Sequence, residues 1–350
     1  MKEKGTVGLS IGIYNKGKTF FYNFGSTEKD KKTIPTENTG YQIGSVTKTF
    51  ISFLLAKAVD EKKVNIDDDI RKYLDGEYPN LEYAGNPIRL INLANISSGL
   101  PDLLPPVPDY ILKAPPDSSF FLTDKFYRNV TKRDFFTALH NVKLDTVPGT
   151  YSKHSNTAAI LLGYILESVY RNTIEELFEK YIVKPYSLNC SLFLSSKTDR
   201  TNIAKGYSDK GELILYEPAF MNSSSGIIST SSDLLKYASV LLANKNNVTQ
   251  LVTNRNIEVD VQTNRTKQIG SKSPFNPSAY SVSLNWLSYK FDNGTIQYWT
   301  DGTTRCFTSY IVFFPQLNSA IVLLANMCNE KVYGALPNMS NAILNLLGGK

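Results

Sequence analysis

Apolar and polar residues alternate at the start of the chain and then change to a helical spacing. Residues 7–13 and 19–24 alternate around Asn15-Lys16-Gly17, which predicts a β-hairpin with a tight turn. From residue 46 to residue 59, apolar side chains recur every three or four positions and predict a helix. Residues 156–170 are apolar on all sides, which predicts a buried helix, and Thr173-x-x-Glu176 is a capping box for the next one.

Strand patterns return in the last quarter of the chain, at residues 283–289, 295–299, 309–314 and 320–325. Residues 336–347 have the pattern of a final amphipathic helix. The N- and C-terminal segments are therefore expected to share one antiparallel sheet. Two proline-rich runs, 103–108 and 114–116, are expected to be loops near a cleft, because proline removes a backbone donor and fixes φ.

Composition and charge argue against several classes of function. The 350 residues carry a net charge of +6, and the basic residues are dispersed among acidic ones, so no basic stripe indicates nucleic-acid binding. No apolar run approaches the roughly 20 residues that span a bilayer. The cysteines Cys190, Cys306 and Cys328 are too few and too scattered for a disulfide framework or a metal site, so we expect free thiols.

Ser45 and Lys48 are the most informative pair in the sequence. They stand three positions apart at the start of a predicted helix, so they lie on one face, about one turn apart. A serine hydroxyl becomes a nucleophile when a neighbouring base takes its proton, and a partly desolvated lysine with a lowered pKa can be that base. Because Ser-x-x-Lys is frequent as an N-cap followed by a solvated lysine, the pair needs support from elsewhere in the chain.

Several further segments supply that support, in a fixed order along the chain. They are Val7-Gly-Leu-Ser-Ile-Gly-Ile13, Gly44-Ser-Val-Thr-Lys48, residues 88–101 with Ser97-Ser-Gly-Leu-Pro101 at their end, Pro148-Gly149, His154-Ser155-Asn156, Leu161-Leu162-Gly163, and Ser225-Gly226-Ile-Ile-Ser-Thr230 followed by Asp233-Leu234. Together they resemble the serine β-lactamase and penicillin-binding protein superfamily, in the branch of class C β-lactamases, DD-peptidases, D-amino-acid peptidases and carboxylesterases. The resemblance covers nearly the whole chain.

This resemblance implies a single domain of the α/β (α+β) class. Residues 1–62 and 225–350 would form the region with the antiparallel sheet, flanked by helices. Residues 63–224 would form a mostly helical insertion into that region.

The resemblance also implies roles for His154 and Asn156. The family carries Tyr-x-Asn at this point, with the tyrosine oxygen beside the serine and the asparagine holding the substrate. Here the tripeptide reads His154-Ser155-Asn156, in a register fixed by Pro148-Gly149 and Leu161-Leu162-Gly163. An imidazole ordinarily titrates near neutrality, so it is a competent general base in place of a phenol. His140 has no such context and is expected to be structural.

The family's third element is Lys-Thr-Gly or His-Thr-Gly on a strand that lines the cleft. Thr300 stands at the position of the cation, and Asp301 adds a negative charge, so a substrate carboxylate would be attracted less. Arg305 could compensate, and its direction is open at this point. Gly302 lets the strand approach the substrate closely. The resemblance further implies an oxyanion hole made by the backbone N–H groups of Ser45 and Thr303.

Two functions from different classes follow from these residues. The first is a serine hydrolase without a cofactor, in which Ser45 forms an acyl-enzyme and Lys48 and His154 move the proton. Its substrate would be a small ester, an amide or a peptidoglycan-derived molecule, with β-lactams turned over poorly. The second is a non-catalytic relative that binds peptidoglycan fragments or a partner in the same cleft.

Location and assembly are less constrained by the sequence. Relatives of this kind are usually exported, so a secreted or periplasmic location is expected, with a leader removed; a cytoplasmic location and the oligomeric state stay open.

Overall fold

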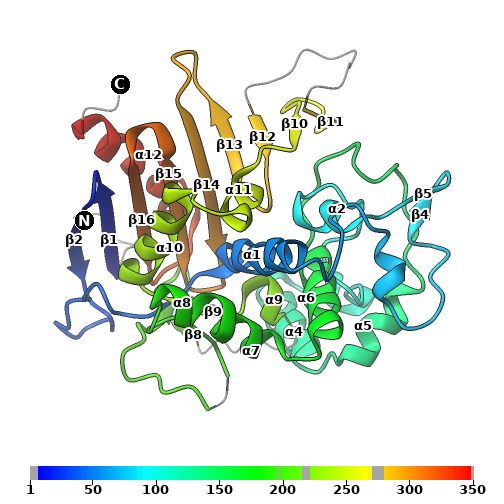
Figure 1. Cartoon of the computed structure of the whole chain (residues 1–350). Helices are drawn as coiled ribbons and strands as arrows, with labels where there is room; N and C mark the ends of the chain where they lie inside the picture. Colours follow the sequence, from blue (N-terminus) through cyan, green and yellow to red (C-terminus); the bar gives the residue numbers. More distant parts are fainter. Residues whose placement is uncertain (1–6, 196, 215–220, 270–279, 348–350) are drawn as a thin grey trace.

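One antiparallel sheet organises the part of the chain that the computed structural model describes, residues 7–195, 197–214, 221–269 and 280–347. Its nine strands follow the order β11-β10-β12-β13-β14-β15-β16-β1-β2, so the first strands of the chain lie beside the last ones (Figure 1). The strands are β1 (Gly8–Asn15), β2 (Lys18–Gly25), β10 (Ile257–Val259), β11 (Thr266–Gln268), β12 (Tyr280–Val282), β13 (Leu287–Lys290), β14 (Ile296–Thr303), β15 (Thr308–Phe314) and β16 (Ser319–Ala325).

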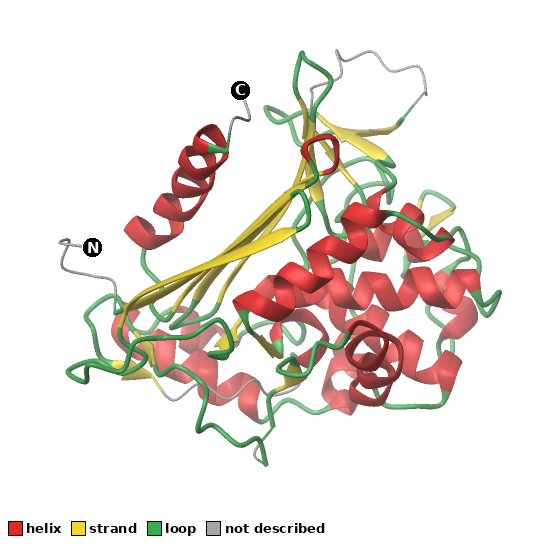
Figure 2. Ribbon diagram, turned by 60° about the vertical axis from the view of Figure 1, so that its left-hand side comes forward, coloured by secondary structure: helices red, strands yellow, loops and turns green. Residues whose placement is uncertain are grey.

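Helices cover both faces of this sheet (Figure 2). α12 (Glu330–Leu346) packs on one face, and α1 (Thr47–Asp60), α10 (Ser231–Ala243) and α11 (Asn247–Thr253) pack on the other. The other α-helices in the described ranges are α2 (Leu90–Ala94), α3 (Asp109–Leu112), α4 (Pro116–Arg128), α5 (Lys132–Leu139), α6 (Asn156–Tyr170), α7 (Ile174–Phe178), α8 (Lys184–Tyr186) and α9 (Asn222–Ser225). None of the helices in the described ranges is long and apolar enough to cross a membrane.

Short strands form three smaller sheets outside the main one. β3 (Tyr41–Gln42), β9 (Ile227–Ser229) and β6 (Leu192–Phe193) form a second sheet in the order β3-β9-β6. Two further pairs join β4 (Glu82–Tyr83) to β5 (Asn86–Pro87), and β7 (Gly206–Tyr207) to β8 (Leu213–Ile214).

Strand β15 shows why the sheet needs helices on both faces. Every residue from Thr308 to Phe314 is buried. Successive side chains of a strand point to opposite faces, so Tyr310 and Val312 join the core under α12, while Ile311 and Phe313 join the core under α1. A strand that is buried on both faces contains few polar residues. Here it separates two apolar cores, one on each face of the sheet.

The predicted fold class is confirmed, and so are most of its elements. Asn15 pairs with Lys18 across a two-residue turn in which Lys16 and Gly17 have positive φ, as expected for a tight hairpin. α6 spans the predicted residues, with Ser155 as its N-cap. The capping box of Thr173 and Glu176 begins α7. The domain boundaries at 62/63 and 224/225 stay a prediction.

Three predicted elements were wrong in detail. Residues 283–289 are not one strand, because a turn with Asn285 at positive φ separates β12 from β13. The side chains of Leu284 and Trp286 in this turn are fully buried, which made the turn look like a strand. The run 114–116 is not all loop, since Pro116 begins α4 at a position that suits proline. α12 begins at Glu330, before the predicted start, and contains Pro337.

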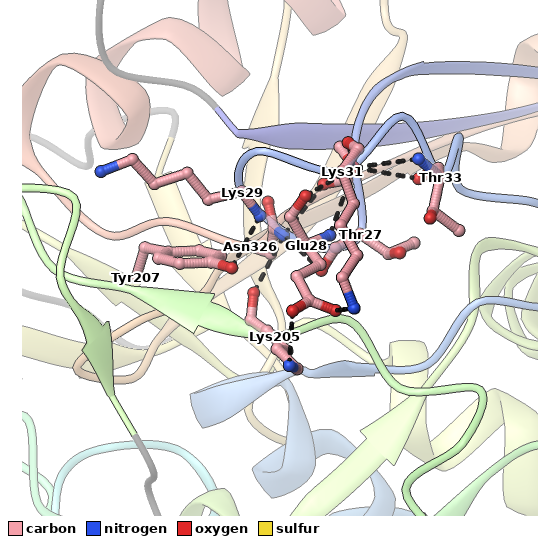
Figure 3. Close-up of polar contacts among 9 residues, drawn as sticks. Thr27, Glu28, Lys29, Lys31, Thr33, Lys205, Tyr207 and Asn326 are labelled. Atoms are coloured by element: carbon pink, nitrogen blue, oxygen red, sulfur yellow. Dashed lines mark hydrogen bonds and ion pairs between the residues drawn. The ribbon is translucent and has the colours of Figure 1, made fainter.

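Buried Asn326 joins three segments at the end of the sheet (Figure 3). Its Nδ2 donates to the carbonyl oxygens of Ser26 at 3.2 Å, Thr27 at 3.3 Å and Lys205 at 2.9 Å. Its Oδ1 accepts from the N–H of Gly8 at 2.6 Å. One amide therefore bonds to backbone groups of β1, of the segment after β2 and of the segment before β7, and ties the three segments together.

Replacing Asn326 by Ala should lower the free energy of unfolding by roughly 2–4 kcal/mol, because the four hydrogen bonds of one buried amide are lost together. Urea denaturation of the native protein and the variant measures the difference. Asn338→Ala is the matched control: its exposed amide bonds to Gly334 within α12, and the change should stay within about 0.5 kcal/mol. Equal effects of the two substitutions would contradict the role given to Asn326.

Candidate active site

Ser45 lies in a short 3-10 turn, Gly44–Val46, between β3 and α1. Gly44 has φ of 52°, and a Cβ at this position would stand 2.8 Å from the amide nitrogen of Thr303. An L side chain rarely adopts this backbone and would collide with the strand, so glycine is required for the close approach. The turn therefore fixes Ser45 against the end of β14.

Lys48, in the first turn of α1, directs its side-chain nitrogen at Ser45. Nζ donates to the Ser45 Oγ at 2.7 Å and to the carbonyl oxygen of Ser224 at 3.1 Å. The residue is 5% exposed, and its burial lowers the pKa to about 7, against the opposing attraction of Asp102 and Asp301. Once Lys48 is neutral, the same short contact can carry the serine proton to nitrogen.

His154 and Asn156 lie at the start of α6 and share one carboxylate, that of Asp102. The His154 Nδ1 is 2.8 Å from the Asp102 Oδ1. The same oxygen accepts from the backbone N–H of Asn156 at 3.3 Å and from its Nδ2 at 3.2 Å. Partial burial raises the pKa of Asp102, but His154 and the Asn156 N–H outweigh it and hold that pKa below its usual value.

The end of β14 forms the opposite wall of the site. β13 pairs with β14 from Ile296 to Trp299, so the strand extends past this neighbour at residues 300–303. A Cβ on Gly302 would lie 2.1 Å from the Ile43 carbonyl oxygen and 2.7 Å from the Ser45 amide nitrogen. Gly302 thus lets the strand and the Ser45 turn meet, and it brings the backbone of Ser45 and Thr303 close together.

Asp301 and Arg305 are two charged residues near this wall, and the sequence did not predict their partners. The Tyr333 hydroxyl of α12 donates to the Asp301 Oδ2 at 3.1 Å, and burial raises the pKa of Asp301. The Arg305 guanidinium is 3.4 Å from the Asp124 carboxylate of α4, and its side chain is 19% exposed. Arg305 is therefore engaged with an acid of α4, and Asp301 is engaged with a hydroxyl of α12.

Residues of the Ser45 turn, of α6 and of the end of β14 line one cleft of about 870 Å³. The predicted site residues in its lining are Ser45, Lys48, His154, Asn156, Thr300, Asp301, Gly302 and Thr303. Leu103 of the proline-rich run also lines it. His140 lies elsewhere, with its ring stacked on Tyr78 at 4.1 Å between centroids.

Among the described residues, no cluster of three or more His, Cys, Asp or Glu side chains could hold a metal ion. Cys190, Cys306 and Cys328 are free cysteines, as predicted.

Asp102 and Tyr333 are site residues that the sequence reasoning missed. Asp102 directly follows the Ser97-Ser-Gly-Leu-Pro101 segment, so its place beside a recognised motif was an available signal. Tyr333 offered none, because the last helix was predicted to begin only at residue 336.

This arrangement of sheet, helices and Ser-x-x-Lys turn has the fold of serine β-lactamases and penicillin-binding proteins. A class C β-lactamase is 20% identical and superposes with a TM-score of 0.73, over 93% of this chain and 87% of that one. The β-lactamase/D-alanine carboxypeptidase from Yersinia pestis is 20% identical, with a TM-score of 0.77 over 98% of this chain and 93% of that one. An octameric penicillin-binding protein homologue from Pyrococcus abyssi is 23% identical, with a TM-score of 0.73 over 98% of this chain and 74% of that one.

The chain belongs to the β-lactamase family, whose family model matches residues 1–341. Among curated relatives, a β-lactamase from Pseudomonas fluorescens is 27% identical over 69% of this chain. Protein flp from Staphylococcus aureus (strain N315) is 25% identical over 98% of this chain. The match spans 61% of the first relative's length and 64% of the second's, so both relatives are longer.

Lys48→Met should stabilise the fold most at acidic pH. The folded-state pKa of Lys48, about 7, lies below the value of about 10.4 for an unfolded chain. Between these values the unfolded chain binds more protons, so native stability rises with pH there and is lowest below pH 7. Methionine fills a similar volume without binding a proton, so the gain in Tm over the native protein should be several degrees larger near pH 6 than near pH 10.

Thermal unfolding at both pH values measures this gain. Lys113→Met, at a lysine side chain that is 78% exposed, is the control and should give no such difference. A gain for Lys48→Met that is the same at both pH values would contradict a buried lysine of low pKa.

Proposed function

We propose that this protein is a serine hydrolase that forms an acyl-enzyme on Ser45 and acts on esters or amides, with β-lactams as poor substrates. The observation that carries the proposal is the 2.7 Å contact between the Lys48 Nζ and the Ser45 Oγ, made by a lysine whose pKa is lowered to about 7. A surface lysine following an N-cap would be solvated and would keep its ordinary pKa. Membership of the β-lactamase family supports the same chemistry.

In the proposed mechanism, the Ser45 Oγ attacks the substrate carbonyl carbon while its proton passes to neutral Lys48. The N–H groups of Ser45 and Thr303 stabilise the negative oxygen of the tetrahedral intermediate. The proton then reaches the leaving oxygen or nitrogen through His154, and the leaving group departs. Water attacks the acyl-enzyme with help from the same bases, releases the acid and restores the Ser45 hydroxyl.

Charge at the end of β14 supports the choice of substrate. Thr300 is uncharged, Asp301 is acidic, and Arg305 is paired with Asp124, so this wall offers weak attraction to a substrate carboxylate. A neutral ester or amide does not need that attraction. We further propose that the substrate is a small molecule, peptidoglycan-derived compounds included, and that the protein works in a secreted or periplasmic location.

Ser45→Ala should abolish hydrolysis of p-nitrophenyl esters, to below about one per cent of the native rate, because no other group in the motif can form the acyl bond. A fluorophosphonate probe should add to the native protein and not to the variant, as intact mass will show. Ser118→Ala, at an exposed serine of α4, is the matched control and should behave as native. No serine-dependent adduct and no turnover would instead favour the non-catalytic protein that binds peptidoglycan fragments or a partner.

Thr300→Lys should improve the binding of substrates that carry a carboxylate, by roughly the 1–3 kcal/mol of a charge-assisted hydrogen bond. The measurement compares KM and kcat/KM for nitrocefin and for a neutral p-nitrophenyl ester in the native protein and the variant. Nitrocefin should be the poorer substrate of the native protein and should gain in the variant, while the neutral ester should not. Efficient native hydrolysis of nitrocefin would contradict the proposed substrate preference.

A further inference from the structure

Asp102 was not one of the predicted site residues, yet it contacts both His154 and Asn156. Its carboxylate accepts from the His154 Nδ1 at 2.8 Å and from two nitrogens of Asn156. Its backbone carbonyl oxygen accepts from the N–H of Thr157 at 2.9 Å, and Pro101 accepts from the Ser155 hydroxyl at 2.8 Å. The 101–102 segment therefore binds every residue from His154 to Thr157.

The position of the His154 proton follows from this contact. A carboxylate only accepts hydrogen bonds, so the Nδ1 that faces it must be the protonated nitrogen. The other ring nitrogen, Nε2, is then the acceptor in the neutral imidazole. His154 lines the same cleft as Ser45, so a histidine held in this form offers a base to the reacting groups.

We infer that Asp102 is a positioning residue for the proposed hydrolase: it holds His154 in the Nδ1–H tautomer, so that the imidazole works beside Lys48 as the second base of Ser45. The inference rests on the proposed function and adds a carboxylate to its serine, lysine and histidine. When Nε2 takes a proton, the ring becomes an imidazolium whose positive charge faces the carboxylate of Asp102. Asp102 stabilises that charge and does not itself accept the proton. Nε2 then donates the proton to the leaving group.

The same carboxylate orients Asn156. The Asn156 Nδ2 donates to Asp102, so the Oδ1 of this side chain is the atom left to accept a hydrogen bond from a substrate. A substrate that offers an N–H donor at that point, such as an amide, would pair with Asn156.

The tautomer of His154 can be observed without any substrate. The chain has only two histidines, so a sample labelled with ¹⁵N at histidine gives two ring systems, and His154→Ala assigns them. In the neutral form, native His154 should show a protonated Nδ1, and Asp102→Ala should move the ring toward the Nε2–H form. His140, stacked on Tyr78, should be unchanged and serves as the internal control. A native Nε2–H ring, or a ring that Asp102→Ala leaves unchanged, would overturn the inference.

Ester hydrolysis tests whether the carboxylate acts through the imidazole. Asp102→Asn keeps the shape of the side chain and removes its charge, and it should lower kcat/KM by roughly 10²-fold, the scale of a positioned acid–base group. In a His154→Ala background the same change should cost much less, because only the orientation of Asn156 then remains to be disturbed. Asp109→Asn, at an acid whose side chain is 82% exposed, is the matched control and should have no effect.

The outcomes separate this inference from the proposed function. An equal loss from Asp102→Asn in both backgrounds would assign Asp102 to the loop structure alone and overturn the inference, while Ser45-dependent turnover would still stand. Absence of turnover in the native protein would contradict the proposed hydrolase, and the tautomer measurement would still decide whether Asp102 positions His154.

Discussion

The close approach of the Ser45 turn to the end of β14 is the constraint on which the site depends. A Cβ on Gly44 would meet the backbone of Thr303, and a Cβ on Gly302 would meet the backbone of Ile43 and Ser45. Glycine on both sides lets two backbones touch where any side chain would separate them. Ser45 is thereby held between the first turn of α1 and a strand of the main sheet, and both elements are held in place by the apolar cores on either side of that sheet.

That constraint also explains the lowered pKa of Lys48. Lys48 lies in the first turn of α1, beside the Ser45 turn and away from water. Its burial disfavours the charged form. Asp102 and Asp301 act in the opposite direction, because their negative charges favour the protonated lysine. The balance leaves a base that changes protonation near neutrality, whereas complete burial without these acids would lower its pKa further, and full exposure would leave it protonated.

Local patterns predicted the elements well where each side chain has one clear environment. α6 and the β1–β2 hairpin followed from periodicity and turn residues, and the Ser45–Lys48 contact followed from helical spacing. The β12–β13 turn did not, because Leu284 and Trp286 are buried by tertiary packing that no local pattern reports. The pairing of Arg305 with Asp124 joins the connection between β14 and β15 to α4, and such long-range partners cannot be deduced from spacing.

The identity of the residue at position 154 changes what its surroundings must provide. A phenol has one oxygen, which both donates and accepts, whereas a neutral imidazole has two nitrogens of which only one is a base. Without a fixed partner on Nδ1, the ring can present either a donor or an acceptor to the cleft. Asp102 supplies that partner from a segment that also binds Ser155 and Thr157, so the ring and its loop are oriented together. A histidine at this position thus needs a partner on Nδ1 to present one defined nitrogen to the cleft, and Asp102 contacts that nitrogen although 52 positions separate the two residues in the chain.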